Sequence, residues 1–388
     1  MNKKELELYI HIPFCVRKCS YCDFLSAPAT EQTREAYMAA LFAEIGGRAK
    51  DYSDRTVTSI FIGGGTPSLL SGEQIGQLMD RIREQFAMAQ DAEITMEVNP
   101  GTASAEKLRN FYTAGINRLS IGMQSAQAEE LKNLGRIHDF EGFCQVYREA
   151  VEAGFTNINV DIMSGLPGQT LASYRDTLEK VLHLEPMPQH ISAYSLIVEP
   201  GTPFAEQKLD LPDEDTEREM YARTAEILAE YGFFQYEISN YASPESVCRH
   251  NLKYWHCEEY LGVGTGAASY MKTTSSGDYC RLKVITDTKA FSEIDWNDQS
   301  SLDKCFMECD ILSLQEQMEE MAFLGLRTKE GVRLPSFYER FGKSFNEVYG
   351  EVVKKYTAMG MMKADETHVA LTLKGMEVAN WIMADFCG

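Results

Sequence analysis

Short apolar segments alternate with longer segments of helical periodicity through the first half of this 388-residue chain. The short segments have the length and the polar flanks of strands, whereas the longer ones repeat apolar residues at helical spacing. This alternation predicts an α/β fold with six parallel strands in a sheet or partial barrel. The expected strands are Leu6–Ile12, Val57–Ile62, Glu93–Val98, Arg118–Gly122, Asn157–Met163 and His190–Ile197. The helices expected between them are Glu31–Ala49, Ser71–Ala87, Ser104–Ala114, Phe140–Ala153 and Leu171–His183.

Polar and glycine-rich residues follow the ends of these strands. In parallel sheets and barrels, the carboxyl ends of the strands lie at one edge and carry the chemistry. We therefore expect one active face, built from segments that are far apart in the sequence. The segments at or after the ends of the first five strands are Cys15–Cys22, Gly63–Ser68, Glu97–Pro100, Gln124–Ser125, and Asp161 with Gly165–Gly168.

The pattern changes after Pro200. A charged helical segment comes first, and the rest mixes short apolar, aromatic and glycine-rich sequences. The last part of this region, Ser275–Ser300, is polar and is expected to be irregular. The segments in order are Asp213–Tyr231, Phe233–Ile238, Cys248–Cys257, Leu261–Ala267 and Ser275–Ser300.

We divide the chain into a barrel at residues 1–205, a barrel extension at 206–305 and a C-terminal domain at 306–388. From Ile311 onward the pattern predicts three helices, a hairpin around Asp365–Thr367 and a last helix, which is typical of an α+β winged-helix-like domain. This part has nine Lys and Arg residues against eleven Asp and Glu residues. The balance disfavours a nucleic-acid partner, since DNA-binding domains carry basic surfaces.

The composition is that of an ordinary globular protein, with 44% hydrophobic and 24% charged residues. The net charge of −21 disfavours attraction to nucleic acid or to an anionic membrane surface. The first residues lack the apolar core of a signal peptide, and no segment has the roughly 20 apolar residues of a membrane span. We expect a cytoplasmic protein with reduced thiols.

Three cysteines, Cys15, Cys19 and Cys22, follow the first expected strand in a C-x3-C-x2-C loop. Three thiolates are one fewer than an iron–sulfur cubane normally takes, so one iron would be left open for another ligand. An open position distinguishes a reactive metal site from a closed structural one. A zinc site completed by His11 fits this spacing equally well, and three unrelated thiols are the third possibility.

The sequence Gly63-Gly64-Gly65-Thr66-Pro67 follows the second expected strand. Glycine tolerates any φ and has no side chain, so the backbone can come close to a ligand. The spacing matches neither a dinucleotide fingerprint nor a phosphate-binding loop. By itself such a run is typical of an ordinary strand–helix turn. Because it shares a face with the cysteine loop, we expect it to contact a ligand.

The residues Tyr9–Cys22 together with Gly63–Pro67 resemble the radical S-adenosylmethionine (SAM) superfamily, in the branch of oxygen-independent coproporphyrinogen III oxidase. The resemblance covers nearly the whole chain and implies a partial (βα)6 barrel. It also implies that the three cysteines hold a [4Fe–4S] cluster and that SAM chelates the open iron. Taken singly, Gln124 and Arg136 would be capping or salt-bridge residues. The resemblance implies SAM contacts from Tyr9, Gly64, Gly65, Thr66, Glu97, Gln124, Arg136 and Asp161.

Two departures separate the chain from the oxidase itself. Phe24 stands where the oxidase has a further cysteine, and the cluster begins at Cys15, which leaves no room for the oxidase's N-terminal extension. Further on, the sequence His250-Asn251-Leu252-Lys253-Tyr254-Trp255 resembles the H-N-x-x-Y-W signature of HemW-type haem chaperones. Imidazole is a common axial ligand of haem, so the resemblance implies haem binding at His250. The alternatives are His256, Cys257 or Cys248 as the ligand, or a core histidine packed beside aromatic rings.

The resemblance therefore implies a haem chaperone that carries a [4Fe–4S] cluster, SAM and haem. Its expected partners are acceptor haem proteins, those of respiratory chains in particular, together with a haem donor protein. The protein is expected to be a monomer or a homodimer. An oxidase of coproporphyrinogen III, or another radical SAM enzyme that modifies a tetrapyrrole, is the alternative, so the sequence leaves enzymatic activity open.

Overall fold

The computed structural model describes residues 4–273, 278–296, 298–302 and 304–388. Its central feature is a run of six adjacent parallel strands at the core of a 12-stranded sheet. This confirms the predicted α/β architecture, although β3 begins earlier than expected because Ala87 pairs with Thr56. The six strands are β1 (Lys4–Ile12), β2 (Arg55–Gly64), β3 (Ala87–Val98), β4 (Arg118–Gln124), β5 (Ile158–Ser164) and β6 (His190–Ser195).

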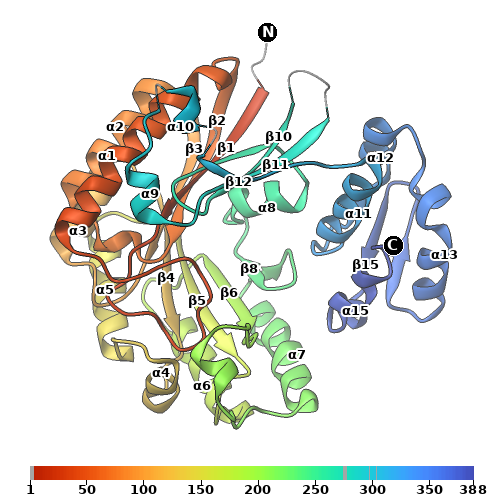
Figure 1. The fold of residues 1–388 in the computed structure, drawn as a ribbon. Helices are drawn as coiled ribbons and strands as arrows, with labels where there is room; N and C mark the ends of the chain where they lie inside the picture. Colours follow the sequence, from red (N-terminus) through yellow and green to blue (C-terminus); the bar gives the residue numbers. More distant parts are fainter. Residues whose placement is uncertain (1–3, 274–277, 297, 303) are drawn as a thin grey trace.

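Helices connect these strands and cover the outside of the sheet (Figure 1). Their starts follow from the sequence, since a Ser, Thr or Asp side chain caps the first turn of each of the five helices that we predicted. A short additional helix, α4, was not predicted. The elements are α1 (Glu31–Arg48), α2 (Gly72–Gln85), α3 (Ala105–Thr113), α4 (Ala128–Leu134), α5 (Phe140–Glu152), α6 (Leu171–Leu182) and the short 3-10 turns η1 (Ala49–Tyr52), η2 (Pro67–Leu69) and η3 (Pro203–Glu206).

Strand alternation separates the hydrophobic core from the interior of the barrel. In β5, Val160 and Ile162 are fully buried in the main hydrophobic core. Asn159, Asp161 and Met163, on the opposite face of the same strand, line a cavity. Successive side chains of a strand point to opposite faces, so one short sequence supplies both the core and the site.

The second part of the chain extends this sheet on both sides. Next to β6, strand β8 pairs antiparallel, whereas β9 pairs parallel with β1 and leads into three antiparallel strands. The prediction that Ser275–Ser300 is irregular is wrong in part, because Tyr279–Val284 forms a strand and Thr288–Ser292 forms a helix. Residues 275–277 and 297 of that prediction lie outside the described residues. The elements are α7 (Glu214–Glu230), β7 (Phe234–Gln235), β8 (Asn240–Ala242), α8 (Arg249–Trp255), β9 (Tyr260–Val263), β10 (Ala268–Lys272), β11 (Tyr279–Val284), α9 (Thr288–Ser292), α10 (Gln299–Leu302) and β12 (Phe306–Ile311).

The C-terminal domain forms a separate lobe beside the barrel (blue in Figure 1). It has its own hydrophobic core, five helices among the described residues and a small sheet in the order β13-β15-β14, which agrees with the predicted winged-helix-like pattern. Arg327 links it to the barrel extension by an ion pair with Glu237 at 3.5 Å and by stacking over Trp255. The elements are α11 (Leu314–Gly325), β13 (Val332–Arg333), α12 (Leu334–Phe341), α13 (Phe345–Ala358), β14 (Met362–Ala364), β15 (His368–Leu371), α14 (Leu373–Met376) and α15 (Ala379–Ala384).

Among the described residues, no helix is both long and apolar enough to cross a membrane.

Candidate functional site

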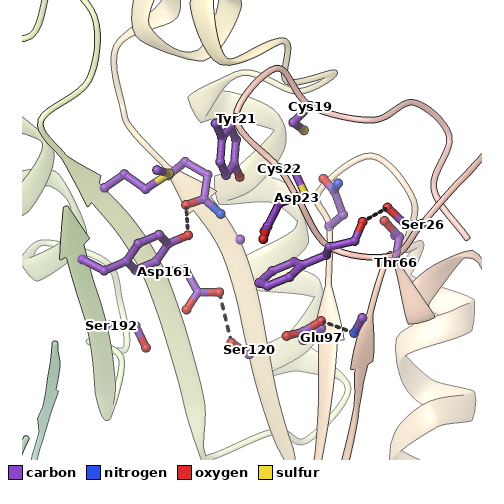
Figure 2. Close-up of a pocket in the computed structure, with 18 of the residues that line it drawn as sticks. Cys19, Tyr21, Cys22, Asp23, Ser26, Thr66, Glu97, Ser120, Asp161 and Ser192 are labelled. Carbon is purple, nitrogen blue, oxygen red and sulfur yellow. Dashed lines mark hydrogen bonds between the residues drawn. The ribbon is translucent and has the colours of Figure 1, made fainter. Parts of the chain in front are cut away.

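A cavity of about 470 Å³ opens at the carboxyl ends of the parallel strands. Its walls bring together most of the residues that the sequence predicts for the site, although these come from five different strands or the loops after them. Figure 2 shows Cys19, Tyr21 and Cys22 at one end and Asp161, Ser120 and Ser192 towards the other. Two predicted site residues, Tyr9 and His250, are not among the described residues that line it. The predicted residues that do line it are Cys15, Cys19, Cys22, Gly64, Gly65, Thr66, Glu97, Gln124, Arg136 and Asp161.

The cysteine loop is held over the cavity by its backbone. Cys15 N donates to Ala27 O at 3.1 Å, and Cys22 N donates to Cys19 O at 3.3 Å. All three thiols are free and half-buried, and burial raises the pKa of Cys22 to about 11. Thr66 Oγ1 lies 3.4 Å from Cys15 Sγ, which connects the loop to the glycine-rich turn.

The donor set fits a cluster better than a zinc ion. Both ring nitrogens of His11 are engaged, Nδ1 with Tyr9 Oη at 3.0 Å and Nε2 with Leu25 O at 2.9 Å, so this residue does not complete a zinc site. In the described part of the chain, no three His, Cys, Asp or Glu side chains are close enough to hold one metal ion. A cubane is bound differently, because each cysteine ligates a separate iron. Three thiols around one cavity suit that arrangement.

The glycine run lies directly beneath the cysteine loop. A Cβ on Gly65 would be 2.6 Å from Phe14 O and 2.9 Å from Phe14 N, and Gly65 N donates to Ile12 O at 2.9 Å. Gly64 has a φ of +111°, which other residues rarely adopt. Gly65 is therefore required by close backbone packing and Gly64 by its backbone conformation, and the turn places its backbone beside the thiols.

Two half-buried carboxyl groups, those of Glu97 and Asp161, face the cavity from β3 and β5. Glu97 accepts a hydrogen bond from Gly64 N at 3.1 Å (Figure 2). Burial, together with the nearby Asp161, raises the pKa of Glu97 to about 8. Burial also raises the pKa of Asp161, although Ser120 and Asn159 donate to it at 3.1 and 2.7 Å. Two such groups in one cavity favour a cationic ligand, whose charge would stabilise their ionised forms.

Arg136 and Gln124 fix the wall between the carboxyl groups and the cysteines. Arg136 donates to Asn99 Oδ1 at 3.0 Å, to Gly122 O at 2.7 Å and to Cys19 Sγ at 3.7 Å. Gln124 adopts a φ of 70° at the end of β4, and its Oε1 accepts from Tyr194 Oη at 2.8 Å. An uncommon backbone conformation of a non-glycine residue is typical of functional sites.

Helix α8, which carries the H-N-L-K-Y-W sequence, packs at the opposite end of the barrel. The backbone N–H groups of Arg249 and His250 both donate to the buried carboxylate of Glu93, at 3.1 Å. Glu93 pairs in register with Ser59 near the amino-terminal part of the sheet. Asn251 reaches the cavity from this side. The helix therefore closes the end of the barrel that lies away from the cysteine loop.

His250 lies on α8, and its side chain is completely buried against β2. Its Nδ1 lies 2.6 Å from Ser59 Oγ, and its Nε2 lies 2.8 Å from Tyr254 Oη. Burial, and secondarily the charge of Arg118, lowers the pKa of His250 to about 3. In this conformation neither ring nitrogen is open to a haem iron.

The other residues considered as haem ligands differ in accessibility. Cys248 and Cys257 are buried, and burial raises the pKa of both to about 12. His256 is partly exposed, and its Nε2 lies 3.8 Å from Glu330 Oε2 of the C-terminal domain. His368 approaches the same carboxylate at 3.2 Å. His256 is thus the most accessible of these alternatives.

Several polar residues of the cavity were not predicted from the sequence. For two of them strand alternation gives a signal: Asn159 lies two positions before the predicted Asp161, and Ser120 lies four positions before the predicted Gln124. For others there was no local signal, because their position depends on distant pairing. Among the residues missed are Tyr21, Arg118, Ser120, Asn159, Ser192, Tyr194 and Asn240.

Comparison with known proteins agrees with this geometry. The family model for the radical SAM superfamily matches residues 9–181, and that for the HemN C-terminal domain matches residues 312–378. The solved structure of coproporphyrinogen III oxidase (HemN) from Escherichia coli is similar with a TM-score of 0.83 and 26% identity, covering 99% of this chain and 90% of that one. The barrel and its cysteine loop therefore define a radical SAM protein with a HemN-type C-terminal domain.

Two curated relatives narrow the assignment to one family. The chain is 37% identical over 385 residues to the "Heme chaperone HemW" of Bacillus subtilis, covering 98% of both chains. It is 43% identical over 263 residues to the protein of the same description from Escherichia coli, covering 68% of this chain and 69% of that one. The chain belongs to the HemW family.

Proposed function

We propose that this protein is a haem chaperone, which binds haem and transfers it to acceptor haem proteins. The observation that carries the proposal is the similarity to a curated heme chaperone over 98% of both chains. Phe24, exposed at the cavity rim where the oxidase has another cysteine, supports it. Respiratory haem proteins are the acceptors we expect. Because the three thiols must stay reduced, we expect the protein to act in the cytoplasm. We also expect it to be a monomer or a homodimer.

Cys15, Cys19 and Cys22 would hold a [4Fe–4S] cluster, and Glu97, Asp161 and the Gly64–Thr66 turn would contact SAM. When bound, the cluster supplies an iron with an open coordination position for the amino and carboxylate groups of SAM. The chain's own contribution is electrostatic. The two carboxyl groups favour a positively charged ligand, and their partial burial makes each of these interactions stronger than it would be in water.

The haem site has two candidate positions. Ligation by His250 requires α8 to leave the end of the barrel, because both nitrogens are hydrogen-bonded inside the fold. Ligation by His256 requires only that its contact with Glu330 be released. We retain His250 as the predicted ligand in an opened state, and His256 as the ligand in the state described.

The test is a comparison of binding with turnover under anaerobic conditions. The reconstituted protein should bind haem stoichiometrically, with a Soret band, and pass it to a haem-depleted respiratory enzyme whose activity returns. Coproporphyrinogen III should stay unchanged in the same preparation. An oxidase function is the second candidate because of the similarity to the oxidase structure. Conversion of coproporphyrinogen III coupled to formation of 5′-deoxyadenosine would establish it and refute a function in haem transfer alone.

A further inference from the structure

The cavity continues beyond Glu97 and Asp161 into a polar region. Of the residues around this region, only Asp161 is among the expected contacts of SAM. Its side chains come from β4, β5, β6, β8 and α8, which are far apart in the sequence. A cavity of this volume is within the usual range for small-molecule sites. We call this region the floor; its residues are Arg118, Ser120, Asn159, Ser192, Asn240 and Asn251.

Most polar groups of the floor are hydrogen-bonded to one another. Asn159 Nδ2 donates to Ser120 Oγ at 2.8 Å, and Ser192 Oγ donates to Asn240 Oδ1 at 2.6 Å. Asn240 Nδ2 donates in turn to Glu237 Oε1 at 2.6 Å. These pairs form a fixed polar scaffold around the one cationic side chain among the six floor residues.

Arg118 is only 2% exposed, yet it lines the cavity and its Nε has no hydrogen-bond partner. Within the described residues its whole guanidinium group forms neither a hydrogen bond nor an ion pair. Arg136 and Arg327 also have an unbonded Nε, but each is hydrogen-bonded through another nitrogen. Arg48 is paired with Glu44 at 3.0 Å. Arg118 therefore differs from the other buried arginines of the barrel.

The nearest anionic groups do not supply its missing partner. Glu93 and Asp161 both act on Arg118 electrostatically. However, Glu93 accepts from the backbone of α8, and Asp161 accepts from Ser120 and Asn159. A guanidinium cannot lose its proton in a protein and is costly to bury without hydrogen bonds. Its unused donors call for an acceptor that enters the cavity.

We propose that the floor is a carboxylate-binding subsite, in which the guanidinium of Arg118 binds a carboxylate of the ligand. A planar fork of N–H donors matches a carboxylate in a two-point contact. Arg136, which lies against Cys19, is placed to serve the methionyl end of SAM. Arg118 is then available for a second carboxylate, and a tetrapyrrole propionate has this chemistry. The choice of a propionate rests on the proposed haem function, whereas the subsite itself does not.

The experiment compares acid and ester forms of the ligand on matched variants. Hemin and hemin dimethyl ester are titrated into the reconstituted wild type, Arg118→Gln, Arg118→Lys and, as a control, the exposed Arg109→Gln. Loss of a charge-assisted contact should weaken hemin binding by Arg118→Gln roughly 10- to 100-fold. The ester should bind wild type and Arg118→Gln equally. Arg118→Lys, which keeps the charge without the fork, should show a smaller loss.

A parallel arm tests the other source of a carboxylate, using SAM and 5′-methylthioadenosine, which lacks the amino-acid part. Weaker binding of SAM alone by Arg118→Gln would assign the subsite to the methionyl carboxylate. If hemin and SAM both keep their wild-type affinity, or if the ester loses as much as the acid, the subsite is refuted. A wild type that does not bind hemin refutes the haem function but leaves the SAM arm to decide the subsite. Should Arg118→Gln fail to fold, the same comparisons on Arg118→Lys decide the outcome.

Discussion

Ser59 Oγ lies 2.6 Å from His250 Nδ1, which joins the second strand of the barrel to the helix at its closed end. Ser59 donates its own proton to Glu7, so it accepts from His250, and Nδ1 therefore carries the hydrogen. Nε2 then accepts from Tyr254 Oη at 2.8 Å. The histidine is a neutral link in a chain of hydrogen bonds from Glu7 to Tyr254. Its first role in this conformation is to hold α8 in place.

His250→Ala should lower the free energy of unfolding by about 2–4 kcal/mol, because it leaves a void, removes the acceptor of the Tyr254 hydroxyl and removes one of the two hydrogen bonds of the Ser59 hydroxyl. It should also weaken haem binding while leaving the absorbance of the cluster intact. Chemical denaturation and a Soret titration measure the two effects. His256→Ala is the matched control, expected to leave stability within about 0.5 kcal/mol. Normal haem binding by His250→Ala would move the ligand to His256 or a cysteine.

His250 should also make the fold sensitive to acid. Its pKa falls from 6.5 to about 3 on burial, so between these values the unfolded chain binds a proton that the folded chain does not. Stability is therefore fully present above pH 6.5 and is lost as the pH falls towards 3. His250→Gln should lose less stability than wild type between pH 7 and pH 4, measured by urea denaturation. Equal slopes for the two proteins would show that the ring is not buried in its neutral form.

Glu97→Gln should remove a second pH dependence of the stability, because glutamine does not titrate. The carboxyl group has a pKa of about 8 when folded against 4.5 in the reference state, so the folded form keeps a proton that the unfolded form loses. Glu97 thus costs stability as the pH rises from 4.5 towards 8. The variant should gain thermal stability relative to wild type at pH 8, without SAM, but bind SAM roughly tenfold more weakly. Tighter SAM binding by the variant would contradict the role of the carboxylate.

Gly65→Ala should disturb the cysteine loop, because its Cβ would meet the backbone of Phe14 at 2.6 Å. We expect reconstitution to yield much less iron and a weaker visible absorbance of the cluster. Gly76→Ala in α2 is the control, since nothing lies within 4 Å of its Cβ and alanine favours a helix by about 1 kcal/mol. If Gly65→Ala binds iron as well as Gly76→Ala does, the turn does not support the loop.

Replacing Cys15, Cys19 or Cys22 singly with serine should abolish stable cluster binding, because each would ligate a different iron. The folded state should persist, since the loop is half-buried and outside the main hydrophobic core. Iron analysis and circular dichroism separate the two effects. Cys309→Ser, at an exposed free cysteine, should keep the full iron content. A protein that retains its cluster after loss of one of the three thiols would contradict the assignment.

The sequence predicted the barrel well because its signals are local. Apolar strands, capping residues and the position of polar segments after strands are all read within a few residues, and α1 begins at Glu31 as expected. The same holds for the cysteine loop and for Glu97 and Asp161. The strand Tyr279–Val284 was missed because its polar residues hide the alternation, which pairing with β10 and β12 stabilises.

The environment of His250 could not be predicted in this way. Ser59 lies 191 residues before His250 in the sequence, and Glu7 lies further still. Nothing in the local H-N-L-K-Y-W sequence shows that α8 is turned into the barrel. Arg118 was hidden for a similar reason. As the first residue of a strand it has the sequence context of an exposed flanking residue, and only the assembled barrel buries it.

The packing of α8 against Glu93 has a consequence for the order of events. As long as α8 covers that end of the barrel, a molecule bound at Arg118 has to pass the cysteine loop on its way in and again on its way out. Whatever occupies the upper part of the cavity therefore determines when the deeper ligand exchanges. The deeper ligand has to bind first and leave last, so the more accessible ligand controls the residence time of the other.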